Sequence, residues 1–388
     1  MKLTKFVIQN FILMLIMGTV YTWSVFRVSV EEVFSVGALA SGVPYMVSLF
    51  FYAVSMMVSG WLTTPKNTRK LAFIGTVMIG LGWGISAWAP TLWVLVIGYG
   101  IIMGYGVGLV YGVPVYILNK TSPKSGFHTG IVLAGFGASP LVTAPMVGLF
   151  LNATNLASTF LLMSVIAFLV LVPLTWSLRL DEHQVQHQNE IINSLDLKRF
   201  SVFYLLFILA TTFGLMMIGL SYRIGVVNYG FSETQTVIAV SIFAFFNGIA
   251  RPIFGWLMDR YAFIWVASLS LLLLVFASLI GLINNGQNVI LFGVSMGLYW
   301  FNLGAWLAII PALVKQAFGT YRYAQRYGTL FTAYGFGAIV GTLLSGVVLD
   351  VFPTTLLLYG VILGLIVLMS ALVALQHRIH QKTSQDTV

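Results

Sequence analysis

The sequence predicts an all-α polytopic membrane protein with twelve transmembrane helices, arranged as two pseudo-symmetric six-helix bundles. Three observations predict it: an apolar composition, twelve apolar runs of helix length, and a one-sided distribution of basic residues. Of the 388 residues, 59% are hydrophobic and 7% are charged, whereas a soluble domain carries about 25% charged residues. This is too little polar surface to cover a globule of this size, so the chain must contact lipid.

Twelve runs are long enough to span a bilayer, which takes roughly 20 mostly apolar residues. The first run follows a charged start, but it has helix length and no close cleavage site, so we interpret it as a span rather than a signal peptide. In chain order the expected spans cover residues 6–27, 39–62, 70–89, 92–118, 127–150, 158–178, 201–224, 234–257, 262–283, 287–313, 326–349 and 354–376.

A polar stretch divides these spans into two sets of six. It reads RLDEHQVQHQNEIINSLDLKRF and is the most polar part of the chain. We therefore expect four segments: an N-terminal six-helix bundle at 1–178, a cytoplasmic linker at 179–200, a C-terminal six-helix bundle at 201–376, and a cytoplasmic tail at 377–388.

The basic residues predict the orientation, because Lys and Arg concentrate in cytoplasmic loops. With the N-terminus in the cytoplasm, 16 of the 19 basic residues fall on the cytoplasmic side, and only Arg27 and Arg223 fall on the other. The remaining one, Arg251, lies within a span. This bias favours cytoplasmic termini in a cell membrane, of the bacterial inner or plasma membrane kind. It also explains the net charge of +9 without nucleic acid as a partner.

Residue types that carry catalysis or bind metals are sparse. There is no Cys, and the five His fall in predicted loops or in the tail, with no pair at zinc-site spacing beside an acid. We expect no enzyme activity, no catalytic residues, no metal and no cofactor. A channel is disfavoured too, because the repeated charges or filter carbonyls that line pores are not found.

Two short repeats relate the halves. GWL occurs at Gly60–Leu62 and again at Gly255–Leu257, and GFGA occurs at Gly135–Ala138 and again at Gly335–Ala338. The offsets of 195 and 200 residues map span 2 onto span 8 and span 5 onto span 11. Two halves of one design resemble the major facilitator superfamily, in which the substrate site lies near the membrane midplane between the halves.

Further motifs resemble one branch of this superfamily. GTVYTWSVF, GLVYGVPV and NGIARPIFGWLMDR, in spans 1, 4 and 8, are similar to the oxalate/formate antiporter family and to bacterial monocarboxylate transporters. The loop TTPKNTRK resembles the superfamily's signature between spans 2 and 3, but Thr64 stands where an Asp is usual. The second copy, GWLMDR, keeps the acid as Asp259.

Arg251 is the candidate substrate ligand. It lies in span 8, where a charge near the bilayer centre costs roughly 2.5–3.5 kcal/mol, and no Asp or Glu lies inside the expected spans. A planar guanidinium suits a carboxylate, and the family resemblance implies that Arg251 binds the substrate's carboxylate. Asn247, one helical turn earlier, is expected to orient it or to add a donor. The alternative is that Arg251 bonds to carbonyls, Tyr or Asn and only clamps helices together.

Tyr334 is the main departure from the family. The dicarboxylate antiporters carry a lysine in a stretch resembling YTAKG, and here FTAYG places Tyr334 in that position. One cation suits a monoanion, so the substitution favours a monocarboxylate over oxalate. The resemblance also places four aromatic residues in the substrate pocket, namely Tyr21, Trp23, Tyr111 and Phe136, although aromatic residues of this abundance more often serve packing.

The expected function is therefore secondary active transport of a small organic anion, of the lactate, formate or pyruvate type, by alternating access. The alternatives are an oxalate/formate-type exchanger and a proton-driven exporter. An exporter would usually carry an acid in the first half's helices, and Glu31 and Glu32 lie beyond the expected first span. The expected partners are the anion and the lipid bilayer, the chain is expected to be a monomer, and coupling to a proton is left open.

Overall fold

The computed structural model describes residues 3–121, 125–180, 196–284, 286–319, 322–352 and 354–385. Within them, twelve helical segments are long and apolar enough to cross a membrane. The prediction of an all-α protein with twelve transmembrane helices is therefore confirmed. The expected linker at 179–200 lies largely outside the described residues.

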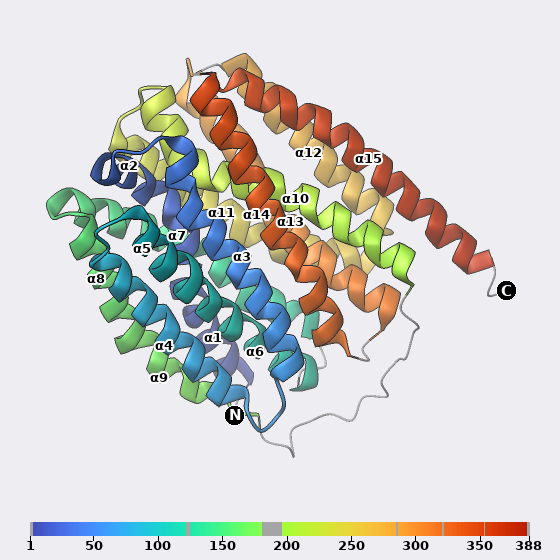
Figure 1. Cartoon of the computed structure of the whole chain (residues 1–388). Helices are drawn as coiled ribbons and strands as arrows, with labels where there is room; N and C mark the ends of the chain where they lie inside the picture. The colour runs from blue at the N-terminus through green and yellow to red at the C-terminus, as the bar shows by residue number, and fades with distance from the viewer. Residues whose placement is uncertain are drawn as a thin grey trace.

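Most spans are single helices, and they are packed side by side (Figure 1). The single-helix spans are α3 (Ala38–Leu62), α4 (Thr68–Ala87), α7 (Ser125–Ala153), α11 (Glu233–Arg260), α12 (Phe263–Asn284), α13 (Val289–Phe318), α14 (Tyr323–Val351) and α15 (Leu356–Gln385).

Four spans change helical pitch along their length. Span 1 comprises α1 (Leu3–Met17), a 3₁₀ turn (Gly18–Thr22) and α2 (Trp23–Phe34). Span 4 comprises α5 (Leu92–Leu95), a π-helical stretch (Val96–Met103) and α6 (Gly104–Thr121). Span 6 comprises α8 (Leu156–Ile166), a π-helical stretch (Ala167–Leu171), α9 (Val172–Leu174) and a 3₁₀ turn (Thr175–Ser177). Span 7 comprises α10 (Leu197–Arg223) and a π-helical stretch (Ile224–Asn228).

Polar residues in the loops mark several helix starts, because the first backbone N–H groups of a helix need acceptors. Asn155 accepts from the N–H of Ser158 at 2.8 Å before α8. Asp196 accepts from the N–H of Lys198 at 2.9 Å before α10. Ser232 forms a reciprocal capping box with Gln235 before α11. These caps end the loops and start the apolar runs at defined residues.

The interface between the halves has the symmetry that the repeats predict. Helix α3 of span 2 packs against α14 of span 11, and α7 of span 5 packs against α11 of span 8; Figure 1 shows α3 and α14 side by side. A twofold relation between the halves exchanges these two pairs. Each GFGA copy contributes a glycine to its pair: Gly137 faces Asn247, and Gly335 faces Ala53.

The extent of span 1 corrects one expectation. We expected it to end at residue 27, but the helix continues to Phe34, so Glu31 lies inside a membrane helix. The reason is local pairing: Glu31 is four residues from Arg27 on the same helix and accepts from Arg223 of span 7. A carboxylate with these partners does not end the helix. At the other end of the chain, α15 runs to Gln385, so the expected tail begins as helix.

The orientation of the chain remains a prediction, and two exposed threonines test it. Thr64 lies between spans 2 and 3, and Thr154 lies between spans 5 and 6. Because the chain has no cysteine, Thr154→Cys and Thr64→Cys each introduce a single thiol. An impermeant maleimide applied outside intact cells should label Thr154→Cys and leave Thr64→Cys unlabelled until the membrane is permeabilised. Labelling of both before permeabilisation would contradict the predicted topology.

Candidate functional site

Arg251 is buried at the interface between the halves. It lies on α11 and is 2% exposed. Its Nη1 donates to the carbonyl of Leu133 on α7 at 2.5 Å, and its Nη2 donates to Oδ1 of Asn247 at 3.3 Å. Its Nε has no hydrogen-bond partner. The guanidinium thus contacts neutral acceptors and keeps a buried donor unused.

Asn247 connects this arginine to a third helix. Its side chain is fully buried, and its Nδ2 donates to the carbonyl of Trp300 on α13 at 2.8 Å. Its Oδ1 accepts from Arg251. The carboxamide therefore donates to α13 through Nδ2 and accepts from the guanidinium through Oδ1. These two bonds fix the position of the guanidinium, as they would if Asn247 orients Arg251.

Gly137 makes the space that these side chains fill. A Cβ atom at this position would lie 2.3 Å from Oδ1 of Asn247 and 3.1 Å from Nε of Arg251. The backbone of α7 therefore comes against both side chains, and any larger residue would displace them. Gly137 is the third letter of the GFGA motif, which sequence reasoning used only as a sign of internal repetition.

Tyrosine hydroxyls surround the arginine. The hydroxyls of Tyr21 in the first half and Tyr334 in the second form a hydrogen bond at 2.7 Å, so this bond crosses between the halves. Tyr111 and Tyr52 also interact electrostatically with Arg251. All four side chains are buried. The structure thus brings together Arg251, Asn247 and three of the predicted tyrosines, and adds Tyr52.

An aromatic cluster encloses the same region. Phe136 lies 5.1 Å from Tyr21 and 5.3 Å from Tyr111, measured between ring centroids. Cζ of Arg251 lies 6.0 Å from the Phe136 ring, at the limit of a cation–π contact. Tyr52 stacks on Phe136 at 5.7 Å, and Phe331 stacks on Tyr334 at 4.9 Å. Sequence reasoning did not select Tyr52 or Phe331, although Phe331 is the first letter of FTAYG.

Trp23 lies in a different cluster. Its ring packs against Tyr99 at 4.4 Å and Phe26 at 6.2 Å, and its indole N–H donates to the carbonyl of Ser41 at 3.2 Å. Phe26 in turn contacts Trp83 and Phe160, all within the first half. The structure does not bring Trp23 together with the other predicted site residues, although it lies only two positions beyond Tyr21.

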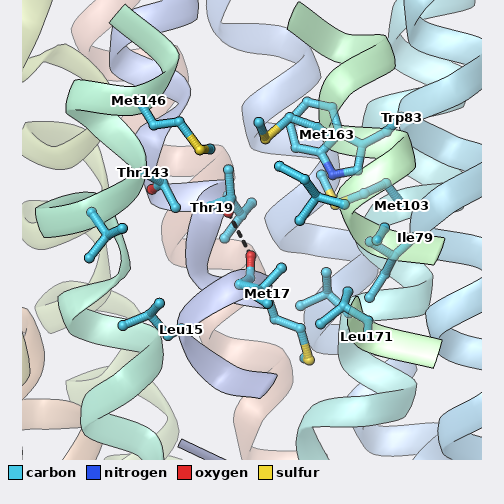
Figure 2. Close-up of a pocket in the computed structure, with 16 residues that line it drawn as sticks. Leu15, Met17, Thr19, Ile79, Trp83, Met103, Thr143, Met146, Met163 and Leu171 are labelled. Carbon is cyan, nitrogen blue, oxygen red and sulfur yellow. Dashed lines mark hydrogen bonds between the residues drawn. The ribbon is translucent and has the colours of Figure 1, made fainter. Parts of the chain in front are cut away.

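A cavity of about 120 Å³ lies elsewhere, inside the first half (Figure 2). Methionine and aliphatic side chains line it, with Trp83 at one side and the hydroxyls of Thr19 and Thr143 as its polar groups. Neither Arg251 nor any tyrosine lines this cavity. An apolar space of this kind offers nothing to hold an anion, so it is not the candidate site.

Within the described part of the chain, no acid forms an ion pair with Arg251, and Glu31 pairs instead with Arg27 and Arg223. The described part of the chain also holds no cluster of His, Cys, Asp or Glu that would bind a metal ion. What the site offers is one fixed cation, several neutral hydroxyl donors and aromatic walls. This chemistry suits a small anion with an apolar part.

Comparison with known proteins places this arrangement in a family. The model of the Major Facilitator Superfamily matches residues 7–227 and again 200–387. The chain belongs to the major facilitator superfamily. The first match covers the expected first half and continues through span 7, and the second covers residues 200–387.

Named transporters are similar to this chain over most of its length. The oxalate:formate antiporter of Oxalobacter formigenes is 23% identical over 356 residues, which cover 86% of this chain and 82% of the antiporter. Monocarboxylate transporter 11 of Mus musculus is 26% identical over 321 residues, or 76% and 69% of the two chains. The crystal structure of a point mutant of the nucleoside transporter NupG matches with a TM-score of 0.71 at 14% identity, covering 96% of this chain and 99% of that one.

Gly137 gives a test of the site's packing. Gly137→Ala should destabilise this transporter by about 1–3 kcal/mol, the usual cost of forcing a methyl group into a filled site, because Asn247 is held by Trp300 and cannot retreat freely. Gly130→Ala is the matched control on the same helix, since its Cβ would meet only Cα of Pro252 at 3.9 Å. Thermal melting of both variants in the same detergent measures the difference. Equal melting temperatures would mean that the close approach at Gly137 is not a constraint.

Proposed function

We propose that this chain is a secondary active transporter of small monocarboxylate anions, of the lactate, formate or pyruvate type, and that Arg251 binds the carboxylate of the substrate. The observation that carries the proposal is the buried guanidinium, whose hydrogen-bond acceptors are neutral and whose Nε is unused. A substrate carboxylate supplies what this group lacks, namely an opposite charge and a further acceptor.

The energetics favour a charged ligand here. An uncompensated charge near the membrane centre costs roughly 2.5–3.5 kcal/mol on insertion scales, and neutral acceptors offset only part of this. A carboxylate can accept two parallel N–H bonds from a guanidinium. Of the five N–H groups of an arginine, the bonds to Leu133 and Asn247 use two, so N–H groups remain that can donate to a carboxylate without breaking these bonds.

The relatives described above support the class of substrate. An oxalate:formate antiporter and a monocarboxylate transporter are similar to this chain over most of its length, and both names specify carboxylates. We carry this class over to the present chain, with Tyr21, Tyr111 and Phe136 as walls of the pocket. Tyr52 and Phe331 join them on the strength of their ring contacts.

The preference for a monoanion rests on Tyr334. It lies where the dicarboxylate antiporters carry a lysine, and its hydroxyl is bonded to that of Tyr21. A dianion placed beside Arg251 would leave its second carboxylate among neutral hydroxyls. A buried charge is costly unless it is paired, so a single cation favours a single carboxylate. This is why we place the oxalate/formate-type exchanger second.

The interface between the halves supports transport by alternating access. Arg251 of the second half bonds to Leu133 of the first, and Tyr21 of the first bonds to Tyr334 of the second. A ligand held by Arg251 and by these hydroxyls contacts both halves at once. Binding therefore changes the balance of contacts between the halves, which is the requirement for coupling a ligand to a two-state movement.

Two rival interpretations are weighed against this one. In the first, Arg251 is only a clamp, an interpretation favoured by its bonds to Leu133 and Asn247. In the second, the chain is a proton-driven exporter, and Glu31 within span 1 supplies the acid that such exporters usually carry. However, Glu31 already accepts from Arg223 and from Ser41, so it is engaged in holding the structure together.

Two substitutions at Arg251 separate ligand binding from clamping. Arg251→Lys keeps the charge but loses the planar group, which should abolish most transport. Arg251→Ala should weaken carboxylate binding by roughly 10- to 150-fold, the equivalent of one charge-assisted hydrogen bond of about 1.5–3 kcal/mol, and should still fold. Binding and thermal melting are measured on the same purified samples.

The control is Arg260→Lys, the same exchange at the exposed end of the same helix, which should leave both readings unchanged. If Arg251→Ala bound carboxylates normally but melted far below the wild type, the arginine would be a helix clamp and the proposed function would fail.

Substitution of Tyr334 tests the preference for monoanions. Tyr334→Lys introduces a second cation beside the site, so uptake of oxalate into proteoliposomes should rise relative to uptake of formate. Tyr334→Phe is the control, because it removes the bond to Tyr21 without adding charge and should not change this ratio. Wild-type protein that transported oxalate as well as any monocarboxylate would show that the single cation does not set selectivity.

A further inference from the structure

A second set of charges ties the halves together at the end of the molecule opposite the termini. Nε of Arg223 on α10 donates to both carboxylate oxygens of Glu31 on α2, at 3.0 and 3.3 Å. Arg27, one turn before Glu31, lies 3.7 Å from the same carboxylate. Glu31 belongs to the first half and Arg223 to the second, so the ion pair crosses the interface. Both are largely buried, with exposures of 16% and 13%.

Arg27 reinforces this tie with neutral acceptors. Its Nη1 donates to the carbonyl of Gly219 on α10 at 3.0 Å, and its Nε donates to Oγ of Ser41 at 3.0 Å. Ser41 in turn donates to Glu31 at 2.8 Å. Asp350, at the end of α14, adds a further tie, because its carboxylate accepts hydrogen bonds from the first backbone N–H groups of α3. Spans 1 and 7, and spans 2 and 11, are therefore joined at this end.

The position of the two arginines on this side is unusual. In the topology that the sequence predicts, Arg27 and Arg223 are the only two of the 19 basic residues on this side of the membrane, and the structure places both at the interface between the halves. Arg27 is six residues beyond Tyr21 on span 1, about 9–10 Å along the helix at 1.5 Å per residue. Arg27 thus lies on span 1 between Tyr21 of the central site and the end of the molecule opposite the termini, and Arg223 approaches Glu31 beside it from span 7.

We propose that Arg223, with Arg27 beside it, is an outer carboxylate-binding site that Glu31 occupies when the halves are closed at this end. When the halves separate, Arg223 moves away from Glu31 and loses its carboxylate. A substrate carboxylate at the opening takes that place, which lowers the cost of separating the ion pair, and then passes to Arg251. The inference rests on the proposed function, since it assigns the same class of substrate to a second site.

Physical arguments favour exchange over a permanent tie. Separating the largely buried ion pair leaves Arg223 without a carboxylate, and a buried charge that loses its charged partner is strongly unfavourable. A free carboxylate has the same chemistry as Glu31, so it compensates Arg223 with the same charge-assisted bonds. Glu31 keeps a charged partner when the halves separate, because Arg27 lies on the same helix, four residues earlier. External anion is therefore expected to favour the open form.

The test uses a single thiol placed between the two sites. Ser24 lies between Tyr21 and Arg27, is fully buried, and its Oγ has no hydrogen-bond partner, so Ser24→Cys is nearly isosteric in a chain without cysteine. The full-length protein is reconstituted, and the rate of labelling by an impermeant maleimide is measured from the side opposite the termini. Sodium formate is compared with sodium chloride at equal concentration.

Three results are expected. Arg223→Gln and Glu31→Gln, each in the Ser24→Cys background, should raise the labelling rate about tenfold or more, the factor that a charge-assisted hydrogen bond represents. Formate should raise the rate in the Ser24→Cys protein itself. This effect of formate should disappear with Arg223→Gln and persist with Arg251→Lys, in which the central site is impaired. Arg260→Gln, at the opposite end of the molecule, is the control and should change nothing.

Other outcomes overturn the inference. If neither substitution changes the labelling rate, the ion pair does not hold the halves closed. If formate still acts on Arg223→Gln but not on Arg251→Lys, the anion works through the central site alone, and the proposed function stands without an outer site. Arg223→Lys, which keeps the charge, is the second variant should Arg223→Gln fail to fold, and it should retain part of the response to formate. If Arg251→Ala binds carboxylates normally while the Arg223-dependent response persists, the proposed function fails and the outer site remains.

Discussion

The unpaired charge of Arg251 constrains the elements around it. A guanidinium buried between membrane helices must find acceptors, and this chain supplies a backbone carbonyl on α7 and the carboxamide of Asn247. Asn247 is then fixed by Trp300 on α13, and α7 approaches through Gly137 because no side chain fits there. The hydrogen bonds of this cation and of Asn247 thus connect α7, α11 and α13, which come from both halves. The aromatic cluster surrounds the cation.

The buried arginines at the centre of the interface and at its end opposite the termini are stabilised in different ways. At the interface end opposite the termini, the arginines have a carboxylate from the protein itself, so part of their charge is neutralised in the closed form. At the centre, the acceptors that the described residues offer Arg251 are neutral. On the proposed function, the charge that the protein neutralises serves as a tie between the halves, and the charge that it leaves unneutralised binds the ligand. The difference lies in the partners, since both groups are buried arginines at the same interface.

Much of the fold was predictable because hydropathy records the constraint that lipid imposes on every span. The twelve apolar runs led directly to the helices, and the two repeats predicted related halves, with which the packing of α3 against α14 and of α7 against α11 agrees. Arg251 was visible as a lone cation in an apolar run. The end of span 1 was misplaced, because a charged residue marks a helix end only when it lacks a partner, and the partner of Glu31 is 192 residues away in sequence.

The rest of the site depends on tertiary contacts that leave little trace in one sequence. Tyr52 has no motif of its own and joins the cluster only because α3 packs against α6 and α14. Trp23 matched a motif, but the 3₁₀ turn at Gly18–Thr22 lies just before it, and its ring packs into the first half. A residue two positions away, Tyr21, contacts the other half instead. In a helix, two positions are enough to reverse the face that a side chain presents.

The closed state of the central site has an energetic consequence. Tyr21 and Tyr334 share one hydrogen bond, which uses the O–H of one hydroxyl and the oxygen of the other when the site is empty. A net hydrogen bond of this kind contributes only about 0.5–1.5 kcal/mol, and an anion can replace it by accepting from both hydroxyls. The unused Nε of Arg251 has no such substitute within the described residues. On the proposed function, the tyrosine pair is therefore the exchangeable part of the site and the arginine is the part that requires a ligand, so a site of this composition closes when empty and still favours an anion.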